Sequence, residues 1–385
     1  MKKKIAILGS TGSIGKTTFD ILKKNKKKYE IILLTTNKNI NELIKQSKIF
    51  NVKNLIVTDT KKYYLIKKKL LSKKINIFNN FNSLNKIFIN RVDYVMSSIS
   101  GLDGLKPTID IIKFTKKIAI ANKESIICGW NLINKELIKY KTVFIPVDSE
   151  HFSIWSLINN TNKDKVEEII ITASGGPFLK TPIKDLKNVT INEALKHPNW
   201  SMGKKISIDS ATMMNKVFEV IEAQKIFNIP FKKFKIIIHP KSYLHAIVKF
   251  NNGLIKMLIH ETNMTIPIFN SINENDIITT NKIDYSILNN LSLSSISKKK
   301  YPSIKILDNL DDKSSLYETA IVAANDELVK LFINKKIKFT QISKILLKIL
   351  KDKEIIKLKR KFPKNFVEIK TLSEYVRLKT ASQRI

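Results

Sequence analysis

Two acidic residues, Asp148 and Glu150, stand two positions apart directly after an apolar run at residues 143–147. On an extended strand end such residues point to one side, so both carboxylates would face the same way, with Ser149 and His151 on the other side. Paired carboxylate oxygens suit Mg²⁺ or Mn²⁺. Alone, the pair fits a solvated loop better than a metal site, so the interpretation depends on a third carboxylate.

A third carboxylate comes from the stretch SIDSATMMNKVFEVIEA at residues 207–223. Asn215 and Glu219 are four residues apart and share one face of the predicted helix, with Lys216 three residues before Glu219. We expect Asp209 to cap the start of this helix. Its packing face contains Met213, Met214, Val217 and Phe218. The converging polar groups favour a ligand site, although a salt-bridged helix exposed to solvent would have the same spacing.

Two loops add groups that could bind an anion or cover a substrate. In SGGPF, residues 174–178, two glycines follow an apolar run and can bring backbone N–H groups close to a phosphate. In HPNWSMGKK, residues 197–205, Trp200 stands in a polar loop. Such an aromatic residue can anchor a core, or it can lie on a lid that covers a substrate and excludes water.

The stretch AILGSTGSIGKTTFD at residues 6–20 has two interpretations. Its ending, Gly15-Lys16-Thr17, resembles a nucleotide-hydrolysing P-loop, but that motif requires a glycine five positions earlier, where Ser10 stands. Its three glycines, spaced every third residue, instead fit a tight turn between a strand and a helix whose N-terminus binds the pyrophosphate of a dinucleotide. The missing glycine counts against an NTPase.

The next apolar run, EIILLTT at residues 30–36, bears on the choice of cofactor. Sites that prefer NAD usually have an acidic residue at the end of this second strand, where it binds the ribose 2′-hydroxyl. Here the chain continues Asn37-Lys38-Asn39 without an acid, and Lys38 can pair with a 2′-phosphate. We therefore expect NADPH, with an ordinary surface lysine as the alternative interpretation of Lys38.

The formal net charge of +36 would ordinarily suggest a nucleic acid or an anionic membrane as partner. The basic residues are nearly all lysines scattered along the chain, whereas recognition of bases and phosphates favours arginine. We attribute the surplus of Lys, Asn and Ile to the AT-rich codons of a bacterial genome and expect neither partner. An anionic, phosphorylated substrate would still be attracted.

Three features of the sequence indicate a cytoplasmic protein. The single cysteine, Cys128, excludes an internal disulfide and fits a reducing compartment. No apolar run is long enough to span a bilayer, and the first apolar run begins at residue 5, which leaves no room for a signal peptide. We expect the 385 residues to form two or three domains.

The N-terminal part alternates short apolar runs with helical patterns, which is typical of a doubly wound parallel sheet. The runs lie at residues 5–8, 31–35, 54–57, 94–97, 118–121 and 143–147. In such sheets ligands bind beyond the carboxyl ends of the strands. The polar clusters ANKES, residues 121–125, and PVDSEH, residues 146–151, stand at two of these ends.

The pattern changes after residue 151. Residues 168–173 form a predicted strand, and residues 247–250 and 254–258 flank the turn signal NNG as a predicted hairpin. Residues 315–385 are mainly helical, and their cationic amphipathic stretch more often packs into a bundle than onto a membrane. We thus expect an α/β protein with four segments: a Rossmann-like NADPH-binding domain at 1–147, an α+β catalytic domain with metal site, substrate site and lid at 148–270, a linker at 271–300 and a C-terminal helical domain at 301–385.

Six of these motifs occur in one order over nearly the whole chain: GSTGSIG, ANKES, PVDSEH, SGGPF, HPNWSMG, and DSATMMNK followed by Glu219. Together they are far more specific than any one alone, and the chain closely resembles the 1-deoxy-D-xylulose 5-phosphate reductoisomerase family. The resemblance implies conversion of that substrate to 2-C-methyl-D-erythritol 4-phosphate with NADPH and Mg²⁺ or Mn²⁺, a committed step towards isoprenoid precursors. It also implies a homodimer.

The resemblance assigns roles to individual residues as well. For NADPH it implies contacts to the pyrophosphate from Thr11, Gly12, Ser13 and Ile14, to the 2′-phosphate end from Asn37, Lys38 and Asn39, and further contacts from Asn122, Glu124 and Gly203. The implied metal ligands are Asp148, Glu150 and Glu219, which form the catalytic set together with Lys123 and His197. The sugar would be held by Lys123, Ser149 and His197, its phosphate by Ser174, Ser210, Asn215 and Lys216, with Glu150, Glu219 and Trp200 also facing the substrate.

The sequence departs from the family at a few positions. Asn37 stands where the family often has glycine, and Lys196 stands where arginine is expected. The first departure bears on how tightly NADPH binds, and neither removes an implied ligand. A P-loop kinase that needs Lys16 and a basic nucleic-acid-binding protein remain as rivals, the first weakened by Ser10 and the second by the scarcity of arginine.

Overall fold

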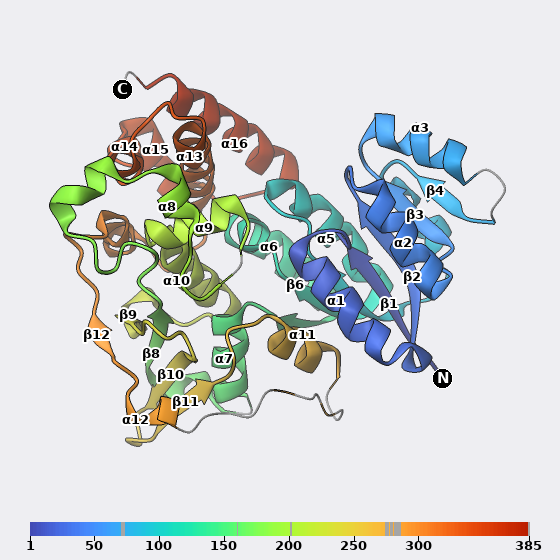
Figure 1. Cartoon of the computed structure of the whole chain (residues 1–385), viewed down its shortest axis with the longest axis horizontal. Coiled ribbons are helices and arrows are strands. Elements are labelled where there is room, and N and C mark those ends of the chain that lie inside the picture. Colours follow the sequence, from blue (N-terminus) through green and yellow to red (C-terminus); the bar gives the residue numbers. More distant parts are fainter. Residues whose placement is uncertain are drawn as a thin grey trace. The chain divides into compact units, whose positions relative to one another are not determined.

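The computed structural model describes residues 1–70, 74–159, 161–200, 202–273, 277, 280 and 286–383 (Figure 1). The chain divides into two compact units. The first contains Met1–Ile126, Asn131–Asp148 and Met264–Ile278, and the second contains Ile127–Trp130, Ser149–Asn263 and Thr279–Ile385.

The first unit is built on a seven-stranded sheet in the order β4-β3-β2-β1-β5-β6-β7, with every neighbouring pair parallel. Its strands are β1 (Lys3–Leu8), β2 (Tyr29–Thr36), β3 (Asn54–Val57), β4 (Asn76–Phe78), β5 (Val92–Ser97), β6 (Thr115–Ile120) and β7 (Val143–Pro146). The order reverses direction at β1, as a doubly wound sheet requires. The predicted parallel sheet is confirmed, and the short edge strand β4 is an addition that the sequence did not indicate.

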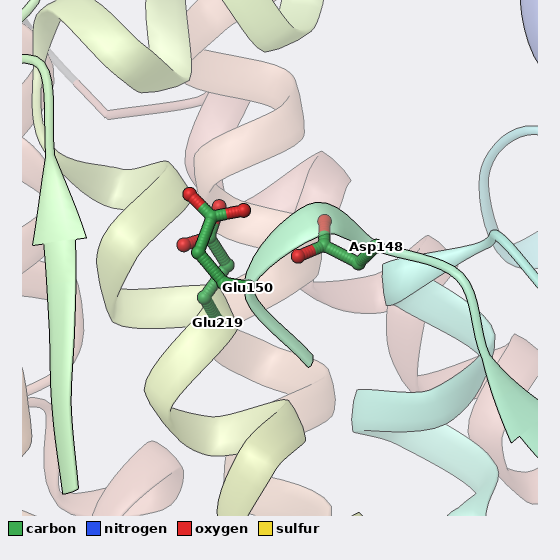
Figure 2. A group of neighbouring side chains, drawn as sticks. All are labelled: Asp148, Glu150 and Glu219. Carbon is green, nitrogen blue, oxygen red and sulfur yellow. The ribbon is translucent and has the colours of Figure 1, made fainter. Parts of the chain in front are cut away.

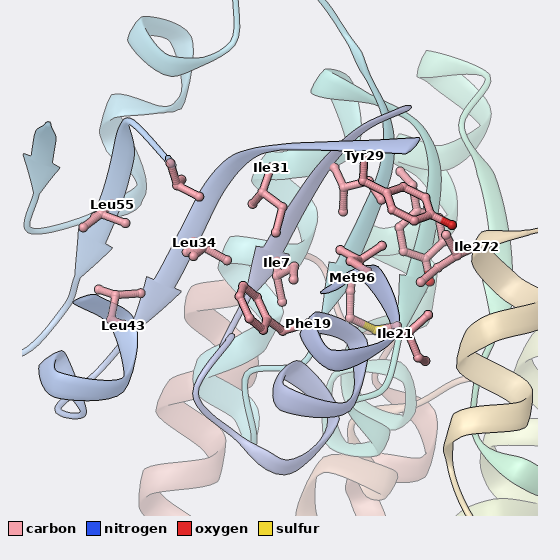
Figure 3. Packing of buried hydrophobic residues seen from close by; sticks show 14 of the residues in the cluster. Ile7, Phe19, Ile21, Tyr29, Ile31, Leu34, Leu43, Leu55, Met96 and Ile272 are labelled. Carbon is pink, nitrogen blue, oxygen red and sulfur yellow. The ribbon is translucent and has the colours of Figure 1, made fainter. Parts of the chain in front are cut away.

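Helices connect these strands, and one helix arrives from far along the chain. They are α1 (Ser13–Lys24), α2 (Ile40–Phe50), α3 (Thr60–Lys69), α4 (Leu84–Ile87), α5 (Leu105–Ile111), α6 (Lys123–Tyr140) and α11 (Thr265–Ile272). The buried side chains of Ile7, Phe19 and Leu34 belong to one apolar cluster that also contains Ile272 (Figure 3). Two buried hydroxyls on the sheet, those of Tyr29 and Tyr94, bond to Asn273 and Ser271 at 2.7 Å. Helix α11 is therefore part of the core of the first unit.

The second unit contains a five-stranded mixed sheet in the order β11-β10-β8-β9-β12. Its strands are β8 (Val166–Ala173), β9 (Phe234–Ile238), β10 (Leu244–Phe250), β11 (Ile255–Ile259) and β12 (Ser294–Ser295). Strands β10 and β11 pair antiparallel around residues 251–254, so the predicted hairpin is confirmed. The helices are α7 (Ser149–Ile158), α8 (Ile191–Leu195), α9 (Lys204–Ala211), α10 (Met214–Phe227), α12 (Ser286–Asn289), α13 (Leu316–Ile333), α14 (Phe339–Ile349), α15 (Lys353–Lys357) and α16 (Phe366–Ala381).

The C-terminal helices pack together, as expected for a bundle (Figure 1). The amphipathic stretch is divided between α14 and α15, and the apolar face of α14, with Ile342, Leu346 and Ile349, is buried. A buried ion pair of 2.8 Å between Lys225 and Glu318 joins α10 to α13. In the part of the chain that the structure describes, no helix combines the length and apolar character needed to cross a bilayer.

The proposed linker at 271–300 is only partly within the described residues. Its residues 274–276, 278, 279 and 281–285 lie outside them, while α12 and β12 lie within its second half.

Candidate active site

Three carboxylates meet where β7 leads into α7. Asp148 follows the end of β7, Glu150 lies in the first turn of α7, and Glu219 lies on α10 (Figure 2). One oxygen from each lies within 4.8 Å of the other two. The expected extended conformation through His151 is wrong, because α7 already begins at Ser149. The His151 ring instead donates from Nε2 to the Glu219 carbonyl at 2.8 Å.

Lysines and an asparagine contact these carboxylates. The Lys216 ammonium pairs with both Glu150 and Glu219, and the Lys123 ammonium pairs with Asp148. Burial alone would lower the pKa of Lys216, but the charges of Glu150 and Glu219 outweigh burial and raise it. The Asn215 amide donates to Glu219, so the predicted polar face of the helix is confirmed. Three hard oxygen donors within reach of one ion fit Mg²⁺ or Mn²⁺.

Asp209 does not cap this helix, which corrects the sequence-based expectation. The chain forms two helices here, and Asp209 lies inside α9, while Met213, at φ 63°, precedes α10. The buried carboxylate of Asp209 accepts a hydrogen bond from Asn325 at 2.8 Å and pairs with Lys205 at 2.9 Å. Burial raises the pKa of Asp209, against the opposing effect of Lys205.

The SGG loop after β8 approaches the end of α9. Gly176 has a φ of +66°, and a Cβ at this position would lie 2.9 Å from the Ser210 carbonyl oxygen. The Ser174 hydroxyl oxygen accepts from the Gly176 N–H at 3.1 Å and lies 3.0 Å from Nε2 of His197. The loop geometry therefore brings Ser174, Ser210 and His197 into one neighbourhood.

His197 organises the loop that carries Trp200. Its Nδ1 accepts the backbone N–H groups of Asn199 at 3.2 Å and Trp200 at 3.0 Å. This assigns the proton of the neutral ring to Nε2, which donates to Ser174. Burial, together with the charge of Lys216, lowers the pKa of His197 to about 4. A neutral imidazole is thus built into this turn.

The glycine turn after β1 fits a dinucleotide rather than a nucleoside triphosphate. A Cβ on Gly15 would lie 2.3 Å from the Gly9 carbonyl oxygen, so α1 can approach the turn only with glycine there. Gly12 precedes α1 and has no side chain to cap it, so no side-chain hydrogen bond satisfies the N–H groups in the first turn of this helix. Thr11 bonds to Thr36 at the end of β2, with their hydroxyl oxygens 2.6 Å apart.

The remaining expected cofactor residues differ in what their side chains contact. Asn37 donates to Thr58 at 2.8 Å, Asn39 caps α2, and Lys38 is exposed. The Asn122 amide is held by the loop after β5, since it donates to the Ile99 and Gly101 carbonyls, and its oxygen caps α6. Glu124 lies in the first turn of α6, whereas Gly203 belongs to the second unit, where it precedes α9.

Three family models together match most of the chain. The model of 1-deoxy-D-xylulose 5-phosphate reductoisomerase matches residues 5–129. The model of the 1-deoxy-D-xylulose 5-phosphate reductoisomerase C-terminal domain matches residues 144–227. The model of the DXP reductoisomerase C-terminal domain matches residues 259–383. The reductoisomerase of Pelagibacter ubique is 61% identical, with all of both chains covered. The chain belongs to the 1-deoxy-D-xylulose 5-phosphate reductoisomerase family. It is accordingly an NADPH-dependent enzyme that converts 1-deoxy-D-xylulose 5-phosphate to 2-C-methyl-D-erythritol 4-phosphate.

Other members of the reductoisomerase family are similar over most of the chain. The enzyme of Wolbachia pipientis from Culex pipiens is 38% identical over 89% of both chains. The Zymomonas mobilis enzyme, solved with NADPH, is 32% identical with a TM-score of 0.87 and covers 99% of each chain. A DOX-P reductoisomerase solved with NADPH, fosmidomycin and magnesium is 30% identical with a TM-score of 0.88, covering 99% of this chain and 98% of that one. The resemblance, the fold class and the reaction expected from the sequence are confirmed.

Two histidines close to Trp200 were not indicated by any sequence motif. His245 lies on β10, and its ring stacks on that of His260 with centroids 3.7 Å apart and planes 17° apart. The Trp200 ring lies 6.3 Å from His245 at 71°. His245 stands among apolar strand residues, His260 directly follows an apolar run, and neither belongs to a motif, so the sequence alone suggests core positions. Only the pairing of β10 with β11 reveals their contact.

Proposed function

We propose that Asp148, Glu150 and Glu219 hold the divalent metal of the reductoisomerase reaction. The single observation that carries this proposal is the convergence of their oxygens within 4.8 Å, in a family whose solved members include magnesium complexes. The bound ion would supply Lewis-acid stabilisation of the charge that develops on substrate oxygens. The neighbouring ammonium of Lys123 would help to hold the sugar beside these carboxylates, together with Ser149 and His197.

The substrate phosphate, on this proposal, binds between the SGG loop and the helix pair α9 and α10. Its ligands would be Ser174, Ser210, Asn215 and Lys216. Two observations support the assignment: Ser174 accepts hydrogen bonds from Gly176 and His197, which leaves its own O–H to donate to a phosphate oxygen, and Lys216 is held in its protonated form. Contacts to a phosphate remote from the reacting carbons supply binding energy that orients them.

Trp200 would cover the bound sugar phosphate and exclude water. The proposal is supported by the construction of its loop, where the His197 ring and the Asn199 side chain fix the backbone. The Asn199 amide donates to the Pro240 carbonyl at 2.6 Å and to the Ser242 hydroxyl at 2.8 Å.

NADPH would bind at the N-terminus of α1. The pyrophosphate would lie against Thr11, Gly12, Ser13 and Ile14, and the 2′-phosphate would lie near Asn37, Lys38 and Asn39. Support comes from the glycine packing of the turn and from the exposed Lys38 just after β2, in the stretch of residues 36–39, which has no acidic residue to bind a ribose 2′-hydroxyl. Asn122, Glu124 and Gly203 would make the remaining contacts.

The larger organisation follows from the same proposal. NADPH binding would belong to residues 1–147, catalysis to 148–270 and the helical domain to 301–385, with 271–300 between them. A homodimer is supported by β11, an edge strand whose Ile255 and Met257 are 56% and 48% exposed. A cytoplasmic location is supported by Cys128, the single cysteine, which is buried and not in a disulfide.

The experiment that tests the metal assignment is NADPH oxidation with 1-deoxy-D-xylulose 5-phosphate and Mg²⁺ or Mn²⁺. We expect Asp148→Ala and Glu150→Ala to lower kcat by at least roughly 10³-fold, because a truncated ligand set no longer holds the ion. NADPH affinity, measured by fluorescence, should stay within about twofold of wild type. Glu167→Ala, which removes an exposed carboxylate of the second unit, is the matched control. Substantial turnover by Asp148→Ala would remove Asp148 from the metal site.

A further inference from the structure

Strand β10 contains a bulge at His245. Leu244 pairs with Ile259 and Ala246 pairs with Leu258, so His245 is the additional residue on β10 where β11 advances by one. A bulged residue is not fixed by the ladder, and bulges commonly redirect a side chain. On the neighbouring strand β8, the Thr172 hydroxyl donates to the Leu244 carbonyl and lies 3.4 Å from that of His245. Thr172 thus fixes the backbone of the bulge, whereas the imidazole of His245 must be positioned by other residues.

His260, the first residue after β11, supplies that restraint. Its N–H donates to the Tyr243 carbonyl at 3.1 Å, and its own carbonyl accepts from Nε2 of His245 at 3.2 Å. Its ring donates from Nδ1 to the Glu261 carbonyl at 2.7 Å and stacks on His245. Burial lowers the pKa of both rings, to about 3 for His245, so the stacked rings are neutral and do not repel each other.

The Trp200 ring lies next to the stacked pair of His245 and His260. The indole lies beside the His245 ring at 6.3 Å in an edge-to-face arrangement, an attractive geometry for two rings. His260, His245 and Trp200 therefore form a continuous row of rings from the end of β11 to the loop after His197. We propose that His260 is a positioning residue for the reaction, which fixes His245 as the face against which Trp200 closes over the substrate. This inference rests on the proposed role of Trp200 as a cover.

The test compares two substitutions that keep the volume of the buried ring site. His260→Phe keeps an aromatic face and should leave KM for 1-deoxy-D-xylulose 5-phosphate within about twofold of wild type. His260→Leu fills the space without a ring and should raise that KM about three- to tenfold, the loss expected for one aromatic contact. KM for NADPH should not change in either variant. Phe114→Ala, which removes the stacked Phe88–Phe114 pair of the first unit, controls for the loss of any ring contact.

A second readout does not depend on turnover. In a Trp130→Phe, Trp155→Phe background, Trp200 is the remaining tryptophan, and its quenching by acrylamide reports its exposure. Adding 1-deoxy-D-xylulose 5-phosphate and Mg²⁺ without NADPH should protect Trp200 in the His260→Phe variant and protect it clearly less in the His260→Leu variant. Equal KM values and equal protection in the two variants would overturn the role of His260. A Trp200 that the substrate does not protect even with wild-type His260 would instead refute the proposed cover.

Discussion

The neutral ring of His197 makes the stability of the protein depend on pH. Because Nδ1 accepts two backbone N–H groups, a proton on this nitrogen would break the turn at residues 197–200. The folded pKa of His197, about 4, lies below the usual 6.5. The unfolded chain therefore takes up the proton first as the pH falls. The contribution of His197 to stability is complete above pH 6.5 and is lost as the pH falls from 6.5 through 4.

We expect His197→Gln to reduce this pH dependence. Between pH 7.5 and pH 4.5, the wild-type free energy of unfolding should fall by about 1–2 kcal/mol more than that of the variant, a figure reduced to allow for the partial exposure of the ring. Urea unfolding at the two pH values measures the difference, with carboxylate titration common to both proteins. Parallel pH profiles for wild type and variant would mean that His197 is not held neutral.

At the scale of elements, the sequence predicted best what is encoded locally. Strand β3 matches its apolar run at residues 54–57, and the hairpin follows from Asn and Gly between two apolar runs. The start of α7 at Ser149 and the division between α9 and α10 were not predicted, because tertiary contacts such as those of Asp209 with Asn325 override the local pattern. The His245 bulge is a property of two paired strands, so no single-strand pattern could indicate it.

The SGG loop gives a prediction at the element scale. Gly176 and Gly253 both have positive φ, +66° and +84°, but only an added Cβ at Gly176 meets another element, at 2.9 Å from the Ser210 carbonyl. Alanine at either position should cost about 1–2 kcal/mol of backbone strain. Gly176→Ala should also raise KM for the sugar phosphate roughly tenfold or more, because the loop moves away from α9. Thermal unfolding of both variants measures the cost of backbone strain, and steady-state kinetics measures the effect of displacing the loop. Equal KM values for Gly176→Ala and Gly253→Ala would argue against a phosphate site at the SGG loop.

For the whole molecule, the net charge opposes association of two copies, whereas the exposed edge strand β11 favours it. The net charge of +36 attracts an anionic substrate and also makes two copies of the chain repel each other. Association therefore requires a specific interface, and β11 provides exposed apolar side chains and an edge that pairs with no other strand among the described residues. Pairing of two β11 edges around a two-fold axis would continue the sheet and place the same residues of each copy in contact.

Lysines on this edge should therefore dissociate the proposed dimer. Ile255 and Met257 are two residues apart and share one face of β11, so the double change Ile255→Lys and Met257→Lys would place four ammonium groups at a symmetric interface. Sedimentation equilibrium should give twice the chain mass of 44.3 kDa for wild type and a single chain for the variant. The matched control is Val367→Lys with Leu378→Lys, which changes two residues of α16 that are 68% and 72% exposed. If that control dissociates equally, added charge alone explains the effect, and a wild-type monomer would refute the dimer itself.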